Sequence, residues 1–220
     1  MNVLVFAPHP DDEILGVGGT LIKHINHHDI VTICVVTRGV EPLFSEQAIL
    51  ETREEARKCH EMVGVNATVY LDFPAVMLEK EDRFKINESM LGVIQSTEPD
   101  VVYIPHIGDM QKDHQIVSEA AMVALRPKYK HVVKKVLAYE TLSETGWHIP
   151  NVSNQFIPNI YSDISQFLEK KLNALACYQS QLSEYPNPRS LEAVEALAKY
   201  RGSTVNVGAA EAFMLIRELS

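Results

Sequence analysis

The sequence alternates short runs rich in β-branched residues with longer amphipathic segments. The short runs predict strands near 2–7, 30–37, 67–71, 100–105 and 134–140, and the longer segments predict helices near 13–27, 45–63, 85–97 and 113–126. Such an order is typical of repeated βαβ units, whose parallel strands form a sheet covered by helices on both faces. We therefore expect an α/β fold with a mostly parallel sheet between two helical layers.

The length of the chain favours one domain. Its 220 residues, 46% hydrophobic and 22% charged, are enough for one substantial core, so we expect a single domain over residues 1–220. After the fifth predicted strand, residues 141–160 are rich in Thr, Ser, Asn and Pro and predict a long loop. Beyond this loop we expect helices near 162–183 and 190–200 and a short final element that returns to the core.

The net charge, the lengths of the apolar runs and the cysteine spacing limit the kinds of partner and the cellular location that we expect. The net charge is -9 at pH 7, and the Lys and Arg residues are scattered, which argues against a nucleic-acid partner. The first residues lack a basic region before a longer apolar stretch, and no later run approaches the ~18 apolar residues of a membrane span. We expect a cytoplasmic protein without a membrane partner. Cys34, Cys59 and Cys177 are widely spaced and predict buried free thiols, not a disulfide or a cysteine metal site.

The densest polar cluster follows the first predicted strand. His9-Pro10-Asp11-Asp12-Glu13 places one imidazole and three carboxylates within five residues. Either Asp11 or Asp12 caps the following helix, where backbone N–H groups favour carboxylates, or the cluster binds a divalent metal. A second predicted strand leads into residues 106–114, which again contain imidazole and carboxylate groups. This repetition favours the metal.

Fold rules predict that the two polar segments meet. The commonest doubly wound order places strand 1 beside strand 4, and ligands bind at the carboxyl ends of strands where the order reverses. His9, Asp12 and His114 then supply the three protein ligands typical of catalytic zinc, with a fourth position for water. Zinc lowers the pKa of such a water to about 7, and Asp11, next to a ligand yet free itself, is the natural general base.

These residues resemble the family of zinc-dependent N-acetylglucosaminyl deacetylases typified by the glycolipid-anchor deacetylase PIG-L and the LmbE-like bacterial proteins. The resemblance rests on the Pro-His-Pro-Asp-Asp-Glu block at 8–13, the Asp-His pair at 113–114 and the Arg-Glu-Glu stretch at 53–55. It implies the metal ligands and the general base just named, and a Rossmann-like three-layer α/β/α sandwich. It also implies a small-molecule amino-sugar substrate. Because relatives often form oligomers, a homo-oligomer is a further expectation.

One position departs from the family pattern. Many members carry a His three residues before the second ligand His, where it is thought to help stabilise the oxyanion, and here that position is Gln111. Three interpretations stay open. Gln111 supplies a neutral donor, His106 takes over the role from the end of the fourth strand, or the activity is weak, because an oxyanion donor contributes about 3 kcal/mol.

Several further residues have both a functional and a structural interpretation. By the resemblance, Arg53 lies near the metal; from its neighbours alone it is an exposed helix residue paired with carboxylates. Asp109 and Asp113 orient imidazoles, as carboxylates behind metal ligands do, or Asp113 caps the helix that begins at His114. Trp147, the only tryptophan, stacks on a sugar ring or anchors the long loop.

Other glycines and histidines carry structural predictions. Gly16, Gly18 and Gly19 lack the spacing of a nucleotide-binding loop, so we expect them to allow close packing of a helix on the sheet. The remaining histidines show no paired carboxylate spacing and are interpreted as surface or structural; they are His24, His27, His28, His60, His131 and His148.

The sequence thus predicts a zinc-dependent hydrolase that removes an N-acetyl group from an N-acetylglucosamine-type amino sugar or its conjugate. Another divalent metal would satisfy the same ligands. The alternatives are an amidase of a sugar-thiol conjugate, a metal-dependent phosphoesterase with two ions, and a catalytically weak sugar-binding homologue. A panel of substrates would distinguish the amidase. A metal-to-protein ratio near two would indicate the phosphoesterase. Tight ligand binding without turnover would indicate the sugar-binding homologue.

Overall fold

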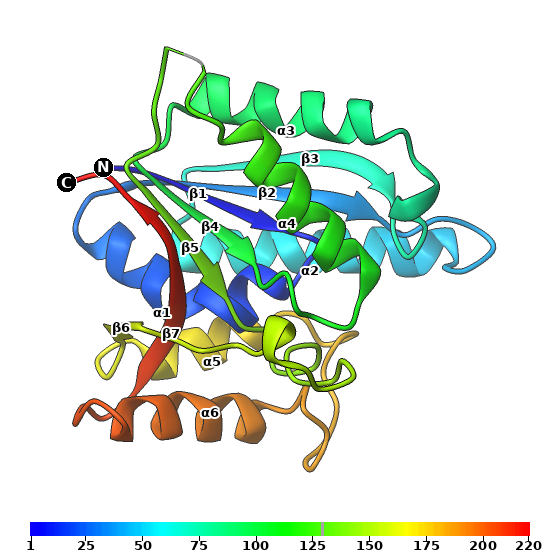
Figure 1. Cartoon of the computed structure of the whole chain (residues 1–220). Helices are drawn as coiled ribbons and strands as arrows, with labels where there is room; N and C mark the ends of the chain where they lie inside the picture. The colour runs from blue at the N-terminus through cyan, green and yellow to red at the C-terminus, as the bar shows by residue number, and fades with distance from the viewer. Residues whose placement is uncertain (129) are drawn as a thin grey trace.

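A seven-stranded sheet forms the middle layer of the molecule, with the strand order β3-β2-β1-β4-β5-β7-β6 (Figure 1). This computed structural model describes residues 1–128 and 130–220. The strands are β1 (Asn2–Ala7), β2 (Ile30–Arg38), β3 (Ala67–Pro74), β4 (Val101–Pro105), β5 (Lys135–Tyr139), β6 (Ile160–Asp163) and β7 (Ala210–Glu218). The strands from β3 to β5 pair in parallel, and β7 pairs antiparallel with both β5 and β6. The predicted parallel sheet and the neighbourhood of strands 1 and 4 are confirmed.

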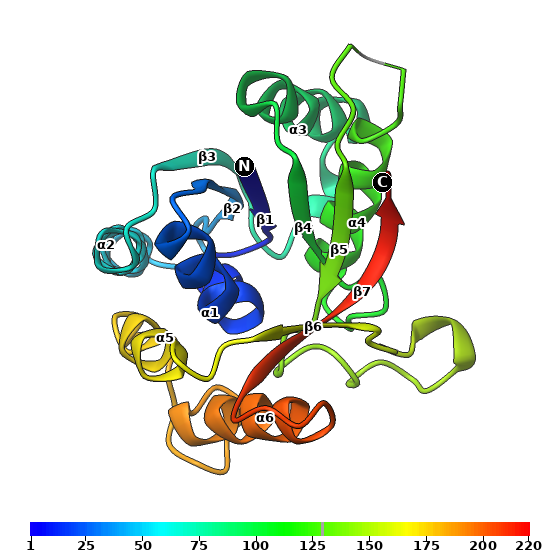
Figure 2. The ribbon, with the colours of Figure 1, turned by 90° about the vertical axis from the view of Figure 1, so that its left-hand side faces the viewer.

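Helices cover both faces of this sheet. They are α1 (Asp12–Asn26), α2 (Glu46–Val63), α3 (Arg83–Thr97), α4 (Lys112–Ala124), α5 (Leu168–Leu175) and α6 (Leu191–Ser203), with short 3-10 turns η1 (Leu78–Lys80) and η2 (Val152–Asn154). Figure 2 shows α3 and α4 on one side of the sheet and α1 and α5 on the other, with α6 packed beyond α5. The expected three-layer α/β/α arrangement is therefore confirmed.

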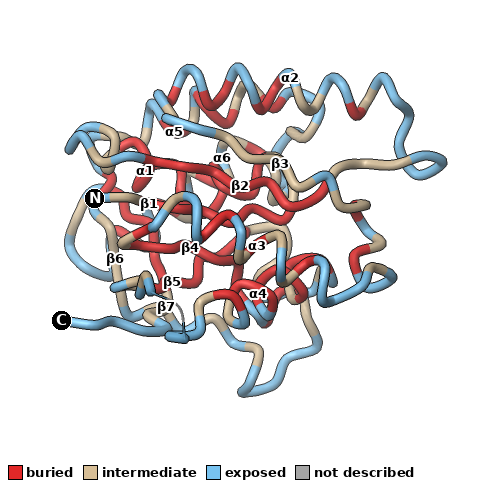
Figure 3. Tube along the Cα trace, turned by 90° about the horizontal axis from the view of Figure 1, so that it is seen from above, coloured by how far each residue is buried: buried red, intermediate tan, exposed pale blue. Residues whose placement is uncertain are grey.

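The first strand shows how the sequence specifies two covered faces. After Asn2 its residues are apolar without polar alternation, and all of these are buried (Figure 3). Leu4 and Phe6 belong to the core cluster shared with α3 and α4, whereas Val3 and Val5 belong to the cluster on the opposite face with α1. Because successive side chains of a strand point to opposite faces, a continuous apolar run fits a strand buried on both sides.

The glycines of α1 allow that helix to approach the sheet. A Cβ atom at Gly16 would overlap the ring of Tyr139 on β5, and one at Gly19 would lie 2.8 Å from Ile164. Both distances are too short for real side chains. The predicted close packing is confirmed at Gly16, which faces β5, and at Gly19, which faces Ile164 directly after β6; the nearest atoms to Gly18 belong to Ile14 and Lys171 and not to the sheet.

The C-terminal region differs from the expected elements. The helix predicted near 162–183 is wrong at both ends, because residues 160–163 form strand β6 and the helix α5 spans only Leu168–Leu175. Strand β6 exists because it pairs with β7, a partner about fifty residues later in the chain. The final element is also longer than expected, since β7 is a nine-residue strand between β5 and β6. The helix predicted near 190–200 is confirmed as α6.

The cysteines and the apolar character of the helices bear on two of the expectations from the sequence. All three cysteines are free, as predicted; Cys34 and Cys59 are buried as expected, whereas Cys177 is only partly buried. Over the described ranges, 1–128 and 130–220, no helix combines the length and the apolar character needed to cross a membrane.

Candidate active site

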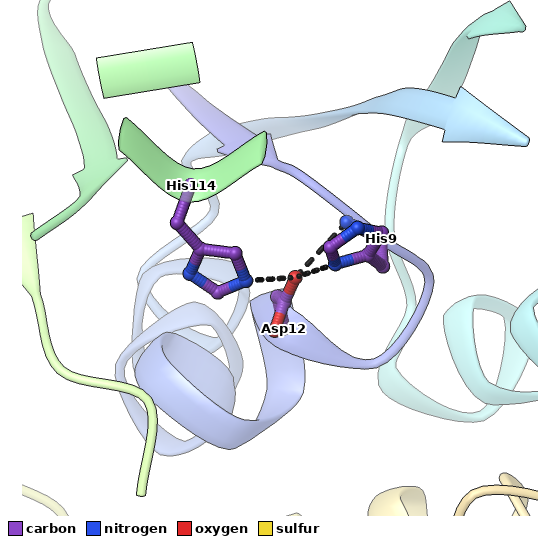
Figure 4. A group of neighbouring side chains, drawn as sticks. All are labelled: His9, Asp12 and His114. Carbon is purple, nitrogen blue, oxygen red and sulfur yellow. Dashed lines mark hydrogen bonds and ion pairs between the residues drawn. The ribbon is translucent and has the colours of Figure 1, made fainter. Parts of the chain in front are cut away.

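The carboxyl ends of β1 and β4 bring the two polar segments together. After β1 the chain places His9 and Asp12 at the start of α1, and after β4 it places His114 in the first turn of α4 (Figure 4). The Oδ2 atom of Asp12 lies 3.2 Å from His9 Nδ1 and 3.2 Å from His114 Nε2. One potential ligand atom from each of the three residues lies within 4.8 Å of the other two. The predicted ligand set therefore converges, as the strand order requires.

The group suits a metal because buried polar atoms lack partners there. Among the described residues, Asp12 Oδ1 is buried without any partner, and His114 Nε2 has only the 3.2 Å ion-pair contact with Asp12 and no hydrogen bond, which is costly unless another group binds these atoms. The other ring nitrogen of His114 lies 2.9 Å from Asp109 Oδ2, so the free nitrogen faces Asp12. A carboxylate behind a histidine is the usual support for a metal ligand. Two imidazoles and one carboxylate are donors that zinc accepts.

Asp113 supports the other imidazole, and Gln111 caps the helix. Asp113 Oδ2 lies 3.0 Å from His9 Nε2 and accepts the backbone N–H of Val76 at 2.6 Å. Gln111 Oε1 accepts the backbone N–H groups of Asp113 and His114, which begin α4. The interpretation of Asp113 as the cap is therefore wrong, because its carboxylate is already used by the neighbouring loop. For α1, Asp11 stands at the N-cap position but its side chain makes no cap hydrogen bond, and Asp12 instead accepts the backbone N–H of His9, so neither carboxylate caps the helix.

The buried imidazoles and carboxylates shift each other's pKa values. Burial lowers the pKa of His9, but hydrogen bonds to Asp113 and Asp12 outweigh it and raise this pKa to about 9. Burial likewise opposes protonation of His114, but attraction by Asp12 raises its pKa to about 10. Burial disfavours the Asp12 carboxylate, yet His114 and His9 hold its pKa well below the usual range. The carboxylates thus attract positive charge to this site, and a divalent cation competes there with protons.

Asp11 stands beside this group in a strained backbone conformation. Its φ angle is 108°, a region that residues with a side chain rarely adopt, and such strain is found at functional sites. Arg189 Nη1 donates to Asp11 Oδ2 at 2.5 Å, while the buried Oδ1 has no partner. Burial raises the pKa of Asp11 to about 8, although Arg189 opposes the shift. Sequence reasoning missed Arg189, which lies 178 residues from Asp11 without any motif around it.

A buried network holds the backbone of Asp11. The backbone N–H of Asp11 donates to Glu13 Oε2 at 3.1 Å. The other oxygen, Glu13 Oε1, accepts the hydroxyl of Tyr178 at 2.5 Å and lies 3.1 Å from His60 Nε2. His60 is structural, as expected, but the pairing with Glu13 was not predicted because the two residues are distant in sequence. The last carboxylate of the motif therefore supports the loop and does not face the ligand group.

A cavity of about 330 Å³ opens beside His9 and Asp11. Gln111, Arg53 and Arg189 line it together with these two residues, and apolar side chains including Phe44 and Ile49 form another wall. Arg53 lines the cavity, but it is half-buried and pairs with Asp72 of β3, not with the carboxylates next to it on α2; its guanidinium lies 3.7 Å from the Tyr70 ring centroid. Glu144, not singled out from the sequence, also lines this cavity.

His106 and Trp147, which the sequence offered for the oxyanion and for sugar stacking, do not line this cavity. His106 is buried, its Nε2 lies 3.1 Å from the carbonyl oxygen of Asn154, and its ring packs against Phe156. Trp147 is 73% exposed on the loop after β5. Within the part of the chain that the structure describes, neither residue belongs to the cavity wall. Gln111, in contrast, lies at the site with its Nε2 3.2 Å from His9 Nε2.

Fold and site together define a Rossmann-like α/β protein with a candidate metal centre at the reversal of its strand order. Comparison with protein families agrees: the PIG-L model, described as GlcNAc-PI de-N-acetylase, matches residues 4–125. The chain belongs to the PIG-L family. The match covers β1 to α4, which carry the whole His-Asp-His group, and it confirms the family that the sequence motifs indicated.

Individual proteins are similar over most of their length. The "Uncharacterized deacetylase YaiS" of Escherichia coli (strain K12) is 26% identical over 184 residues, which cover 81% of this chain and 91% of that protein. The "Diacetylchitobiose deacetylase" of Thermococcus kodakarensis is 26% identical over 196 residues, covering 83% of this chain and 71% of that protein. The solved structure of the conserved protein TT1542 from Thermus thermophilus superposes with a TM-score of 0.79 at 26% identity, covering 100% of this chain and 96% of that chain.

Proposed function

We propose that this protein is a divalent-metal-dependent N-deacetylase that hydrolyses the N-acetyl group of an N-acetylglucosamine-type sugar or its conjugate. One observation carries the proposal: His9, Asp12 and His114 converge, and His9 of this group lines an open cavity together with Asp11. Membership of a family described by GlcNAc-PI de-N-acetylation and relatives named as deacetylases support the same reaction. Neither of these relatives is named as an amidase of a sugar-thiol conjugate.

His9, Asp12 and His114 would hold the ion, and Asp109 and Asp113 would keep the two imidazoles in orientation through their second ring nitrogens. Zinc suits this mixed imidazole and carboxylate set, and other divalent ions compete for it. When bound, the ion supplies Lewis acidity toward water and toward an acyl oxygen.

The remaining steps belong to the side chains of the chain itself. Asp11 takes a proton from the water that attacks the acetyl carbon, and this proton then passes to the sugar nitrogen as the C–N bond breaks. Gln111 uses its oxygen to cap α4, so its amide donor is left on the cavity side near His9. That donor stabilises the developing oxyanion as a neutral group. Arg53 at the cavity wall binds a polar group of the substrate.

The structure favours this function over a two-metal phosphoesterase. In the described part of the chain, only one group of His, Cys and acidic side chains has the spacing of metal ligands. Two-metal sites need ligands for ions roughly 3.5–4 Å apart. A metal-to-protein ratio near one is therefore expected, and a ratio near two would favour the phosphoesterase.

The test is zinc-restored turnover. Metal-stripped protein is assayed for free amine released from N-acetylated amino sugars, nucleotide sugars and sugar conjugates, with and without added zinc. Turnover of one substrate that depends on zinc supports the proposal. Zinc binding without turnover of any of them would contradict it and favour the sugar-binding alternative. The single domain, the cytoplasmic location and the homo-oligomer stay predictions from the sequence.

A further inference from the structure

Arg189 reaches the cavity from a segment that is distant in sequence. It precedes α6, and its guanidinium lies against Asp11, with Nη1 donating to Oδ2 at 2.5 Å and Nε donating to Ser143 Oγ at 3.3 Å. Both Arg189 and Asp11 line the cavity. Asp11 is buried, while the Arg189 side chain is 25% exposed. The pair therefore joins the N-terminal motif to the C-terminal part of the chain at the candidate reaction site.

The backbone of Arg189 is fixed by the start of α6. The N–H of Arg189 donates to Asn187 Oδ1 at 2.8 Å, and its carbonyl accepts the N–H of Ser183 at 3.2 Å. The next residue, Ser190, caps α6 by accepting the N–H of Ala193 at 3.1 Å. A guanidinium anchored in this way loses little further freedom when it holds a carboxylate.

Asp11 combines a strained backbone with a carboxylate for which residues 1–128 and 130–220 supply a single hydrogen-bond donor. Its positive φ angle is disfavoured for a residue with a side chain, and Glu13 holds only its backbone N–H. Among the residues that the structure describes, Arg189 is the one hydrogen-bond donor to the Asp11 carboxylate, and it takes Oδ2. Oδ1 is buried and left without a partner, one residue before the metal ligand candidate Asp12. The arrangement engages one oxygen of the carboxylate and leaves the other available.

We propose that Arg189 is a positioning residue for the deacetylation: it holds Oδ2 of Asp11 and thereby directs Oδ1 toward the attacking water. This inference rests on the proposed function. Arg189 acts through Asp11 and needs no contact with the substrate. The competing interpretation is that Arg189 binds an anionic group of the substrate directly, and the two differ in whether kcat or KM responds.

The first experiment compares R189M and R189K with R57M. Arg57 is an exposed arginine on α2 that pairs with Glu54 and Glu61, so R57M is a matched control outside the cavity. We expect R189M to lower kcat about 100-fold, as small misplacements of catalytic groups do, with KM within about twofold and zinc stoichiometry unchanged. R189K should recover part of the loss. A rise in KM at unchanged kcat would overturn the proposal.

A double-mutant cycle separates the two interpretations. If Arg189 acts through Asp11, R189M in the D11N background should cost less than about threefold, because the group that it positions is already gone. A second loss as large as the first would mean that Arg189 acts independently on the substrate. Partial recovery of R189M by guanidinium ion in solution, without recovery of R189M in the D11N background, is also expected.

A structural readout keeps the inference testable if no substrate is found. In crystal structures of the zinc-loaded wild type and R189M, the Asp11 carboxylate should turn away from its position while His9, Asp12 and His114 stay in place. An unchanged Asp11 carboxylate in R189M would overturn the role of Arg189. Failure of zinc-restored turnover in the wild type, in contrast, would overturn the proposed function and with it the deacetylation role of Arg189, even if R189M moves the Asp11 carboxylate.

Discussion

Helix α1 contacts two groups of buried charge, and they differ in how completely their atoms are bonded. Midway along the helix, Glu211 of β7 accepts the N–H groups of Gly19 and Thr20 and the Lys171 ammonium at 2.6 Å. Lys171 also donates to the carbonyl of Leu15. At the first turn of the same helix, Asp11 and Asp12 each keep one buried oxygen without a partner.

This difference separates a structural role from a functional one. A buried charge with all its partners contributes to a single rigid arrangement, whereas buried atoms without partners reduce stability unless a ligand binds them. The Lys171–Glu211 pair has its partners within the protein, and the first turn of α1 leaves atoms available for an ion and a substrate. Substitutions at the two places should therefore have opposite consequences for stability and activity.

The largest effect is expected from D11N. Removing the proposed base should lower kcat by about 10²–10⁴-fold, the usual contribution of a general base, while zinc binding is retained because Asp11 is not a ligand. The measurement combines zinc content of the purified variant with steady-state kinetics on the substrate found for the wild type. Full turnover with bound zinc would mean that Asp11 is not the general base. The unpartnered oxygen of Asp11 would then not indicate a functional role for the first turn of α1.

The converse effect is expected at Glu211. E211A leaves the Lys171 ammonium buried without its partner, and breaking a buried pair in this way costs about 3–5 kcal/mol of unfolding free energy. Chemical denaturation of the metal-free protein measures the loss. The double variant K171M/E211M removes both charges and should recover part of the stability, because the N–H groups of Gly19 and Thr20 still lose Glu211. Equal stability of E211A and the wild type would mean that this pair does not hold the helix.

Q111A should affect both properties, each by a smaller amount. It removes the cap of α4, which should cost about 1 kcal/mol of unfolding free energy. It also removes a donor near His9, so kcat should fall, by up to about 10²-fold if Gln111 stabilises the oxyanion. Denaturation and kinetics on the same preparation separate the two effects. A loss of stability with unchanged kcat would restrict Gln111 to the cap.

The metal group was predictable because each member directly follows a strand or begins the next helix. The apolar runs before His9 and before His106 fix the strand ends, and the doubly wound order then brings the segments together. The resemblance added the assignment of the family, which the comparison confirms. Local sequence signals and one general rule of sheet topology were sufficient to predict the His-Asp-His group.

The supports of Asp11 were not predictable in the same way. Arg189 and Tyr178 lie far from the motif in sequence, in a region where a helix was predicted too long and strand β6 was missed. Their positions depend on how α5, α6 and β7 pack, which no short pattern specifies. The cap at Gln111 was missed because Gln is not a preferred residue there, and the nearby Asp113 was the more usual choice.

The smallest effect is expected for W147A. Trp147 is 73% exposed and does not line the described cavity wall, so its removal should change the unfolding free energy by less than about 0.5 kcal/mol. KM for the amino-sugar substrate should also stay within about twofold of the wild type. A large rise in KM without loss of stability would mean that the loop after β5 closes on the sugar and that stacking by Trp147 contributes to binding. The substrate site would then extend beyond the cavity beside Asp11.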